Sequence, residues 1–410
     1  MKGGKDVKVL YITSGFNGGY PHQFIDQFIK TSFNSVSHQM RHFDLVPNLG
    51  WHRKLYQVID SFNPDYVFTI HGGYMTESIV QRIKESGCKV GIWFVDDPYD
   101  IDASKQKLFS YDYIFTNEKE CIPVYNRHGF PRVFHLPLGV QTAFYRPQRI
   151  EGQYYSDLCF VGTPFPERIN ILKYLVAKLP RLSYTIIGPQ WSSYLSGRAR
   201  VINHPLGPGE VSKYYNGARI NLNIHRNEVE QFNPALVLNQ ERIRASSPNN
   251  RTFDIAACRS FQIVDNRRGL EEYYDLKKEL VTFDDKTDLA KKVEYYLNSS
   301  EERSLIANRA YRRTLQHYTF EQVLNRMLST VENNLLDEIR VAIRCLNGRG
   351  EMGGKLVKGA GPAVYFLHHG RKYSFPNEET FLQLGCHWEH INIMSEHELN
   401  SIPSGMQIRL

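Results

Sequence analysis

The segment from Arg251 to Glu271 combines a basic side chain, a helix start and an acidic side chain in an order that suits a phosphorylated ligand. It reads R-T-F-D-I-A-A-C-R-S-F-Q-I-V-D-N-R-R-G-L-E, which predicts a short helix from Arg251 to Cys258 and an apolar strand from Phe261 to Val264. Arg251 then stands in the first helical turn, where free backbone N–H groups and the helix dipole favour a phosphate. Glu271 follows the turn after the strand, where open α/β sheets bind ligands, and offers a carboxylate to hydroxyl groups.

Two other stretches supply candidates for the same phosphate groups. Leu158 to Thr163 is an apolar strand pattern that ends near Gly162, and a glycine there leaves room for the backbone beside a phosphate. Arg168 lies at the start of the next expected helix, where it can contact a diphosphate. Arg226 ends an alternating strand pattern and either binds phosphate or forms a surface ion pair.

Two strand ends in the first half carry groups that can move protons. His71 follows the apolar stretch Tyr66 to Ile70, so it either faces an open cleft and handles protons or caps the next helix. Asp96 and Asp97 follow a strand that ends at Phe94; one of them can act as a general base or hold a sugar, although an Asp before Pro is also an ordinary turn starter. Adjacent residues of an extended chain point opposite ways, so at most one faces the cleft, and we favour Asp97.

The run R-T-F-D-I-A-A-C…I-V-D…G-L-E resembles the donor-site signature of nucleotide-sugar glycosyltransferases of the GT-B type, and is similar to their spore-maturation, CgeB-like branch. That signature often reads R-x-F-E-x-x-A-C-G…E, so Asp254 replaces the usual Glu and Arg259 replaces the Gly. The resemblance covers about residues 7 to 335. It implies that Arg251 lies near the donor diphosphate, that Asp254 contacts the ribose and that a histidine such as His71 lies near the reacting sugar.

The resemblance also implies an activity, the transfer of a hexosyl group from a nucleoside diphosphate sugar to an acceptor hydroxyl. The expected donor is a UDP-sugar, and the expected acceptor is a glycan or glycoprotein in surface or spore polysaccharide synthesis. No further cofactor or metal is expected, because arginines and helix N-termini can meet the charge of a leaving diphosphate. Two alternatives remain: a nucleotide-sugar epimerase of the same fold, and a non-catalytic sugar- or nucleotide-binding protein of a surface assembly.

The elements that must position these residues alternate between strands and helices, which predicts parallel, doubly wound sheets. With the resemblance, this implies an α/β fold of two Rossmann-like domains (GT-B) facing a cleft: an acceptor domain over residues 1–147 and a donor-nucleotide domain with closing helices over 148–346. The last long helix either crosses back to the first domain or packs on the second, and capping boxes are expected at Ser299 with Glu302 and at Thr319 with Gln322. Further strands are expected over Val7–Thr13, Val90–Phe94, Tyr113–Thr116, Val133–Leu136, Tyr184–Ile187 and Leu280–Phe283, with helices over Pro21–Lys30, Trp51–Phe62 and Thr76–Glu85.

The bulk composition limits the class of protein. With 410 residues, 41% hydrophobic and 23% charged, the chain predicts a globular protein of two or three domains. Its net charge of +7 comes without a Lys/Arg tract, so nucleic acid is not an expected partner. The 6 cysteines form no C-x-x-C pair, which favours neither a zinc site nor disulfides. No apolar run reaches the roughly 20 residues of a membrane span and no signal peptide is recognised, so we expect a cytoplasmic location.

A glycine-rich connector, Asn347 to Gly354, precedes a last module of short strands and one small helix over residues 355–410. Its stretch G-P-A-V-Y-F-L-H-H-G-R-K-Y-S-F-P resembles short repeat modules of some bacterial surface-associated proteins, and it is expected to dock to another protein or a glycan. Its aromatic residues form either a small core or a glycan platform. His387, His390 and His397 lack accompanying cysteines, so no metal site is predicted.

Overall fold

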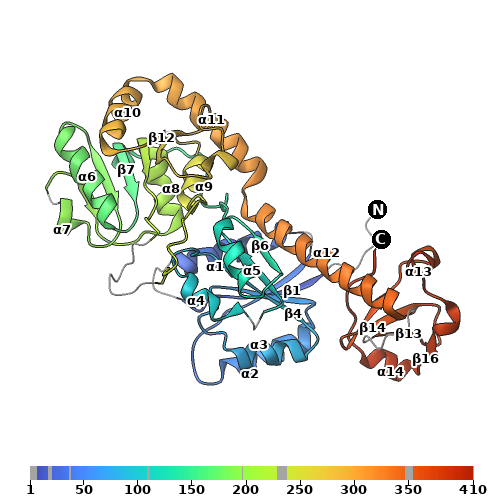
Figure 1. The fold of residues 1–410 in the computed structure, drawn as a ribbon. Helices are drawn as coiled ribbons and strands as arrows, with labels where there is room; N and C mark the ends of the chain where they lie inside the picture. The colour runs from blue at the N-terminus through green and yellow to red at the C-terminus, as the bar shows by residue number, and fades with distance from the viewer. Residues whose placement is uncertain are drawn as a thin grey trace.

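The computed structural model describes residues 7–16, 21–36, 38–108, 111–195, 197–228, 238–346 and 354–409. Figure 1 shows two α/β lobes beside one another and a long helix that leads from them to a third, smaller lobe. Each lobe is built on its own sheet. The predicted fold class, two Rossmann-like domains and a small C-terminal β-rich module, is therefore confirmed, while the predicted domain boundaries stay predictions.

The first domain is a parallel sheet with strand order β2-β1-β3-β4-β5-β6. Alternate residues of β1 enter two different cores, Val9 on one face and Leu10 on the other, so both faces are covered and the strand reads as a continuous apolar run. The strands are β1 Lys8–Ile12, β2 Gln39–Phe43, β3 Tyr66–Ile70, β4 Lys89–Phe94, β5 Tyr113–Thr116 and β6 Val133–His135. The helices are α1 Pro21–Ser32, α2 Trp51–Phe62, α3 Glu77–Glu85, α4 Ile101–Lys105 and α5 Ile122–Arg127.

Strand β2 is missing from the sequence-based prediction. Its sequence, Q-M-R-H-F, is mostly polar, and the strand stands at the edge of the sheet, where it pairs with β1. An edge strand needs no apolar run because part of it faces solvent. Its presence decides the topology: β1 has β2 on one side and β3 on the other, so the strand order reverses between β1 and β3.

The second domain has the same design, with strand order β12-β11-β10-β7-β8-β9. Here the order reverses at β7, which pairs with β8 on one side and β10 on the other. The strands are β7 Ser156–Val161, β8 Tyr184–Ile187, β9 Arg200–Ile202, β10 Ala218–Asn223, β11 Gln262–Asp265 and β12 Val281–Phe283. The helices are α6 Pro166–Lys178, α7 Ser192–Leu195, α8 Pro208–Gly217, α9 Asn250–Ala257, α10 Lys286–Asn298 and α11 Ser300–His317.

Helix α9 forms where the sequence predicted it and for the predicted reason. Ile255, Ala256 and Ala257 are fully buried, so small side chains let the helix lie close to the sheet. The side chain of Asn249 caps the helix by accepting a hydrogen bond from Thr252 N at 3.2 Å. Arg251 therefore stands in the first turn of the helix, as expected.

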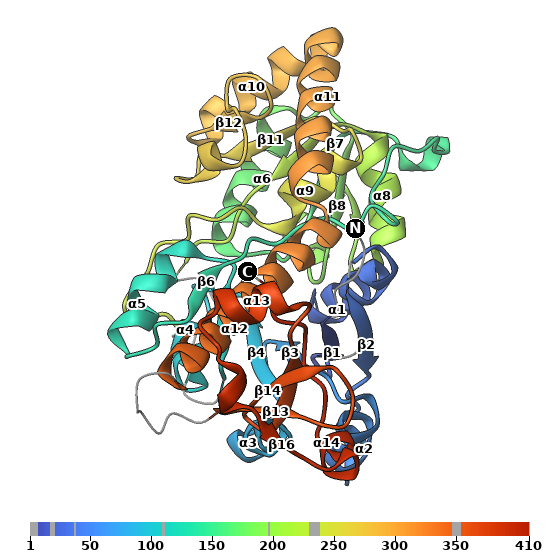
Figure 2. The same cartoon turned by 90° about the vertical axis from the view of Figure 1, so that its right-hand side faces the viewer.

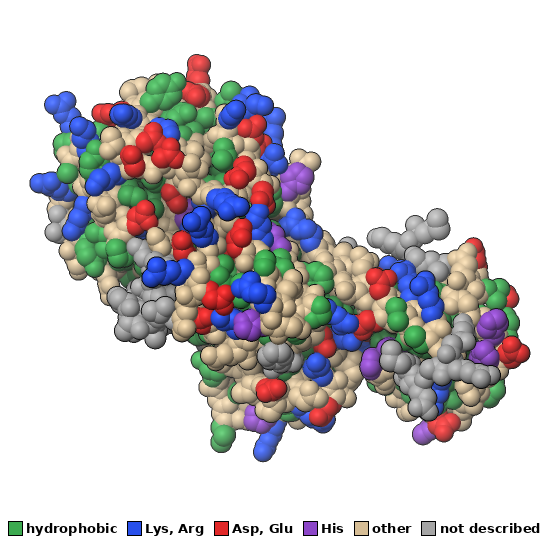
Figure 3. All heavy atoms as spheres, in the orientation of Figure 1, with side chains coloured by type: hydrophobic (Ala, Val, Ile, Leu, Met, Phe, Trp, Pro, Cys, Tyr) green, Lys and Arg blue, Asp and Glu red, His purple; other side chains and the backbone are tan. Residues whose placement is uncertain are grey.

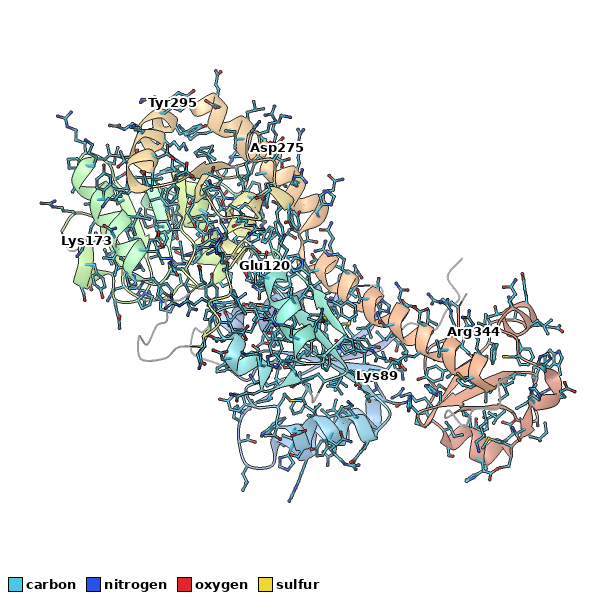
Figure 4. The ribbon with its side chains drawn as sticks, in the orientation of Figure 1. Lys89, Glu120, Lys173, Asp275, Tyr295 and Arg344 are labelled. Carbon is cyan, nitrogen blue, oxygen red and sulfur yellow. The ribbon has the colours of Figure 1, made fainter. Side chains whose placement is uncertain are left out.

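Helix α12 (Phe320–Leu346) crosses from the second domain back over the first and reaches the C-terminal module (Figure 2). The Phe320 ring lies 5.4 Å from the Phe28 ring and 6.3 Å from the Trp93 ring, both in the first domain. Further along, Glu338 pairs with Lys89 at 2.8 Å; Lys89 is labelled beside this helix in Figure 4. Of the two arrangements predicted for the last long helix, the crossing is the one that forms.

One of the two predicted capping boxes forms. Thr319 N donates to Gln322 Oε1 at 2.9 Å, and Gln322 N donates to Thr319 Oγ1 at 3.4 Å. The box predicted at Ser299 is wrong, because the Ser299 hydroxyl donates to the Tyr295 carbonyl of the preceding helix instead. Glu302 is engaged by the Tyr295 hydroxyl at 2.9 Å. Helix α10 ends at Asn298, directly before Ser299, so its last turn binds the side chains of Ser299 and Glu302 that the capping box would need.

The C-terminal module is a small mixed sheet with strand order β15-β14-β13-β16. Phe366, Tyr373 and Phe381 are buried, so these aromatic residues form a core rather than a platform. Figure 3 shows histidines on the surface of this lobe, but among the described residues there is no group of three or more His, Cys, Asp or Glu able to hold a metal. The elements are β13 Gly354–Lys358, β14 Val364–His368, β15 Arg371–Ser374, β16 Asn392–Ile393, α13 Glu378–Gln383 and α14 Glu396–Ser401.

A buried arginine fastens this module to the first domain. The Arg371 side chain, 2% exposed, pairs with Asp65 Oδ1 at 3.0 Å. It also donates to Asn63 Oδ1 at 2.9 Å, Pro64 O at 2.6 Å and Gly87 O at 2.9 Å. The module is thus packed on the first domain, and most of the predicted glycine-rich connector lies outside the described residues.

Candidate active site

The second domain gathers arginine side chains at its strand-order reversal, between the carboxyl ends of β7 and β10. Arg251 donates from Nη1 to Val161 O at 2.6 Å and from Nη2 to Ile224 O at 2.9 Å. Arg168 donates from Nε to the same Ile224 O at 3.0 Å and from Nη1 to Thr163 O at 3.1 Å. Carbonyl oxygens carry only partial negative charge, so an anion at this reversal would gain charge-assisted hydrogen bonds from both guanidinium groups.

Gly162 makes this pairing of arginines possible. A Cβ atom at this position would lie 2.4 Å from Arg251 Nη1 and 3.3 Å from Arg168 Nη1. The glycine therefore leaves space for the two guanidinium groups. Direct room for a phosphate beside Gly162, as the sequence predicted, remains a prediction.

Arg226 stands where the two domains meet. Its guanidinium lies 4.4 Å from the centroid of the Tyr99 ring in the first domain and 5.0 Å from that of Phe165 in the second. Its backbone carbonyl accepts hydrogen bonds from the Tyr99 hydroxyl at 3.0 Å and from Arg267 Nη2 at 2.7 Å. Arg267, which the sequence did not single out, thus adds a further cation to the arginines of this edge.

The two carboxylates predicted for the donor site, Asp254 for the ribose and Glu271 for hydroxyl groups, lie in different surroundings. Asp254 is 4% exposed, and its Oδ1 makes no hydrogen bond to any described residue. Burial raises the pKa of this carboxyl well above its ordinary value, although Arg251 opposes the shift. Glu271, on the short helix Leu270–Glu272, is exposed and accepts a hydrogen bond from Gly269 N at 2.9 Å. The fold does not present Asp254 to a ribose in this conformation, and both roles remain predictions.

His225 and Asp265 form a pair that the sequence analysis missed. Asp265 Oδ1 lies 2.7 Å from both His225 N and His225 Nδ1, while Asn249 N donates to His225 Nε2 at 3.2 Å. Because Nε2 accepts, the ring is neutral; burial, with smaller effects from nearby charges, lowers the pKa of His225 to about 4. The pair ties the ends of β10 and β11 to the start of α9. The signal that could have revealed this pair is the position of the two residues: each follows or ends a predicted strand, and the two strands are neighbours in the sheet.

In the first domain, two histidines and an aspartate meet at the other strand-order reversal. His22, near the start of α1, has its Nε2 at 2.6 Å from Asp96 Oδ2. The His22 ring centroid lies 4.7 Å from that of His71, and the Phe16 ring lies within 4.9 to 5.1 Å of both. His22 follows β1 and His71 follows β3, so only the reversal between these strands brings them together. His22 was not predicted, because its neighbour in space depends on the strand order.

The charges of this cluster set its protonation. Burial disfavours a charged His22 ring, but the ion pair with Asp96 outweighs burial and raises the pKa of His22. Burial, followed by the charge of His22, lowers the pKa of His71 to about 4, so His71 is neutral near pH 7. The pKa of Asp96 is lowered although burial opposes it, because His22, His71 and Arg226 favour its charged form. Arg226 thus carries the electrostatic influence of the second domain to the cluster.

His71 is not a helix cap, so that alternative is wrong. Helix α3 is capped by Thr76, whose Oγ1 accepts a hydrogen bond from Ile79 N at 3.4 Å. His71 instead has a left-handed backbone with φ of 60°, and its carbonyl accepts a hydrogen bond from Lys107 Nζ at 2.8 Å. Non-glycine residues in this conformation cluster at functional sites.

Asp97, the aspartate favoured for the cleft, points into the core instead. It is 2% exposed and accepts hydrogen bonds from Thr116 Oγ1 and Tyr125 OH, both at 2.6 Å, and from Ser104 Oγ at 3.3 Å. Burial raises the pKa of Asp97 to about 6. Asp96, whose side chain is 37% exposed, is the one beside the histidines. The adjacent aspartates do point opposite ways, but the favoured choice between them is corrected.

Comparison with solved structures identifies the fold. The two parallel-sheet domains resemble the GT-B fold of glycosyltransferases. Sucrose-phosphate synthase from Thermosynechococcus elongatus matches with a TM-score of 0.56 at 10% identity, covering 80% of this chain and 99% of that one. Anabaena HepE in complex with UDP and glucose matches with a TM-score of 0.52 at 10% identity, covering 80% and 99%. At these identities the likeness concerns the fold.

The sequence comparisons point to the particular branch. A family model described as glycosyl transferase-like matches residues 168–329. Spore protein CgeB of Bacillus subtilis (strain 168) is 29% identical over 323 residues, which cover 77% of this chain and 96% of CgeB. The predicted resemblance to the CgeB-like GT-B glycosyltransferases is therefore confirmed. Within the described ranges, none of the helices has the length and apolar character needed to cross a membrane.

Proposed function

We propose that this protein transfers a hexosyl group from a nucleoside diphosphate sugar to an acceptor hydroxyl. The observation that carries the proposal is the pairing of two clusters, Arg168 and Arg251 at the strand-order reversal of one domain and His22, His71 and Asp96 at that of the other. A cationic edge suits a diphosphate, and a cluster with a partly exposed carboxylate suits an acceptor hydroxyl. Two half-sites on facing domains are what a reaction between two substrates needs.

The donor diphosphate would bind at the arginines. Charge grows on the diphosphate as its bond to the sugar breaks, and fixed donors aimed at such a charge are the largest common source of catalysis. Arg251 and Arg168 supply these donors, with Arg226 between the two clusters. We propose that this charge stabilisation needs no metal, so that turnover persists in the presence of a chelator.

The acceptor hydroxyl would lie at Asp96. Its oxygen forms a bond to the anomeric carbon, the bond from that carbon to the diphosphate oxygen breaks, and the electron pair leaves with the diphosphate. The hydroxyl proton passes to the Asp96 carboxylate, which the ion pair with His22 holds in place. The neutral His71 ring contacts His22 and closes one side of the cluster.

The donor and the setting are the finer parts of the proposal. HepE was solved with UDP and glucose, which supports a UDP-sugar as the donor here. CgeB is a spore protein, which supports a glycan or glycoprotein acceptor in spore or surface polysaccharide synthesis, and we keep the cytoplasmic location as part of this proposal.

A thermal-shift screen with UDP, GDP, dTDP and their sugars tests the donor site. A ligand that binds only the folded state stabilises it by about 2.7 kcal/mol at 100 times its Kd. We expect one nucleotide to raise the melting temperature selectively, with Arg251→Ala abolishing both this rise and turnover. Arg259→Ala, which removes an exposed arginine just past the same helix, should preserve both.

Three outcomes would contradict the proposal. Near-normal turnover of Arg251→Ala would remove its proposed role. Conversion of the donor sugar without any acceptor would point to an epimerase, and nucleotide binding without any turnover would point to a binding protein.

A further inference from the structure

Glu118 makes a buried contact between the two large domains. It follows β5 in the first domain and is 1% exposed. Its Oε2 accepts hydrogen bonds from Ser246 N at 2.8 Å and Ser247 N at 2.9 Å, and its Oε1 accepts one from Ser246 Oγ at 2.5 Å. These three donors belong to the second domain, while Glu120 N of the first domain also donates to Oε1, at 3.2 Å. Hydrogen bonds to a carboxylate are roughly twice as strong as neutral ones.

The two serines connect directly to the arginine edge. Ser247 O accepts a hydrogen bond from Arg267 Nη1 at 3.3 Å, and Arg267 Nη2 donates to Arg226 O. Two residues after Ser247 comes Asn249, the cap of α9, whose first turn holds Arg251. A shift of this loop therefore moves the cap, the helix start and the arginine together.

The ion pairs that cross the same junction between described residues are more exposed than Glu118. Glu241 pairs with Lys105 and Arg127, each at 3.0 Å, and its side chain is 39% exposed. Lys119 pairs with Glu272, with side chains 34% and 48% exposed. Exposed pairs contribute little, because water screens them and side-chain ordering opposes them. In Figure 3, basic and acidic side chains alternate along this junction, and Figure 4 labels Glu120, two residues past Glu118, at the same place.

We propose that Glu118 is a positioning residue for the transfer reaction. It holds the Ser246–Ser247 loop, and through it the arginine edge, at the distance from Asp96 and His22 that the reaction requires. The proposal rests on the proposed function. Glu118 acts through the arginines and does not contact either substrate.

The contact requires a carboxylate of this length. Two consecutive backbone N–H groups of the second domain point at one oxygen, and the Ser246 hydroxyl and the Glu120 N–H group point at the other. Glutamine would keep the shape but offer only one acceptor oxygen, so an N–H group would face either the backbone donors or the hydroxyl. Ser246→Ala removes the hydroxyl alone and leaves both backbone donors, which makes it a milder version of the same change.

Kinetics on the full chain test the proposal, with UDP-glucose or the sugar nucleotide found by thermal shift as donor. For Glu118→Gln we expect kcat to fall at least about tenfold while the nucleotide Kd changes less than about threefold. The kcat of Ser246→Ala should lie between that of Glu118→Gln and that of the wild-type protein. Lys119→Ala, which removes an exposed cross-domain pair one residue away, should keep its kcat. Small-angle scattering should show a larger radius of gyration for Glu118→Gln than for Lys119→Ala.

The outcomes separate this inference from the function on which it rests. If the wild-type protein binds nucleotide but transfers no sugar, the proposed function is contradicted. If the wild-type protein transfers sugar and Glu118→Gln has the same kcat, the positioning role is contradicted. Equal kcat losses in Lys119→Ala also overturn it, since any cross-domain pair would then serve. If Glu118→Gln fails to fold, kcat and nucleotide Kd of Ser246→Ala decide the question.

Discussion

Asp96 and Asp97 are the same side chain on adjacent residues, yet the fold gives them opposite surroundings. Asp97 is enclosed by three hydroxyl groups inside the first domain, whereas Asp96 lies 2.6 Å from His22 with its side chain 37% exposed. A buried carboxylate that already accepts three hydrogen bonds has a structural role. A partly exposed carboxylate beside two histidines is available for a proton. At the scale of the residue, burial and neighbours decide the chemistry.

This contrast predicts different effects for one substitution at two adjacent positions. Asp96→Asn removes the proposed proton acceptor, so we expect turnover to fall about 100-fold or more with little change in melting temperature. Asp97→Asn keeps the shape but loses an acceptor inside the core, so we expect about 1–3 kcal/mol of lost stability and near-normal turnover of the folded protein. Turnover and thermal melting of both variants check this. The reverse pattern would return the catalytic role to Asp97.

Helix α9 shows how one element positions a candidate site residue, Arg251. Its buried residues set its distance from the sheet, and the Asn249 cap sets where it begins. The His225 ring accepts a hydrogen bond from Asn249 N and is itself held by Asp265. The position of Arg251 is therefore set by the capped start of α9 as well as by its own hydrogen bonds.

Removing the cap should displace Arg251. Asn249→Ala should cost about 1 kcal/mol of stability and also weaken nucleotide binding, because the first turn of α9 would fray. Asn377 makes the same capping contact at the start of α13 in the C-terminal module, with Oδ1 accepting from Thr380 N at 2.8 Å. Asn377→Ala should cost similar stability without changing the nucleotide Kd. Equal binding losses in both variants would mean that general destabilisation is the cause.

At the scale of the whole molecule, two buried polar contacts and one long helix hold the three lobes together. Glu118 joins the two large domains, and Arg371 joins the C-terminal module to the first domain. Helix α12 spans all three lobes (Figure 2). The predicted docking of this module to another protein or a glycan remains a proposal. Whatever it binds would be held at a fixed position relative to the first domain.

Breaking the Arg371 contact should detach the module. Arg371→Ala leaves Asp65 buried without its guanidinium partner, so we expect about 3–5 kcal/mol of lost stability in thermal or denaturant unfolding. Arg409→Ala removes a pair with Glu332 at 3.3 Å in which the arginine is 48% exposed, so it should change stability little. Faster hydrogen exchange in β15 in Arg371→Ala alone would locate the effect. Equal stability of the two variants would contradict it.

Local pattern was enough to predict much of this protein. Apolar runs of four to six residues marked most strands, because parallel strands with both faces covered must be apolar throughout. The helix that contains Arg251 followed from its small apolar residues, and the start of α12 followed from the capping box at Thr319 and Gln322. Whether α12 crosses back to the first domain did not follow from the sequence. The run from Arg251 to Glu271 indicated the resemblance to GT-B glycosyltransferases that the comparisons confirm, because that run is contiguous in the chain.

Other features depended on which segments meet in space. The polar strand β2 has no apolar signal, yet it places the strand-order reversal that brings His22 to His71. The choice between Asp96 and Asp97 depends on which of them meets His22 and which meets the hydroxyl groups of Thr116 and Tyr125. Glu118 reads as an ordinary loop residue until Ser246, 128 residues later, is folded against it. Contacts between distant segments are set by topology and burial, and no local pattern in the chain encodes them.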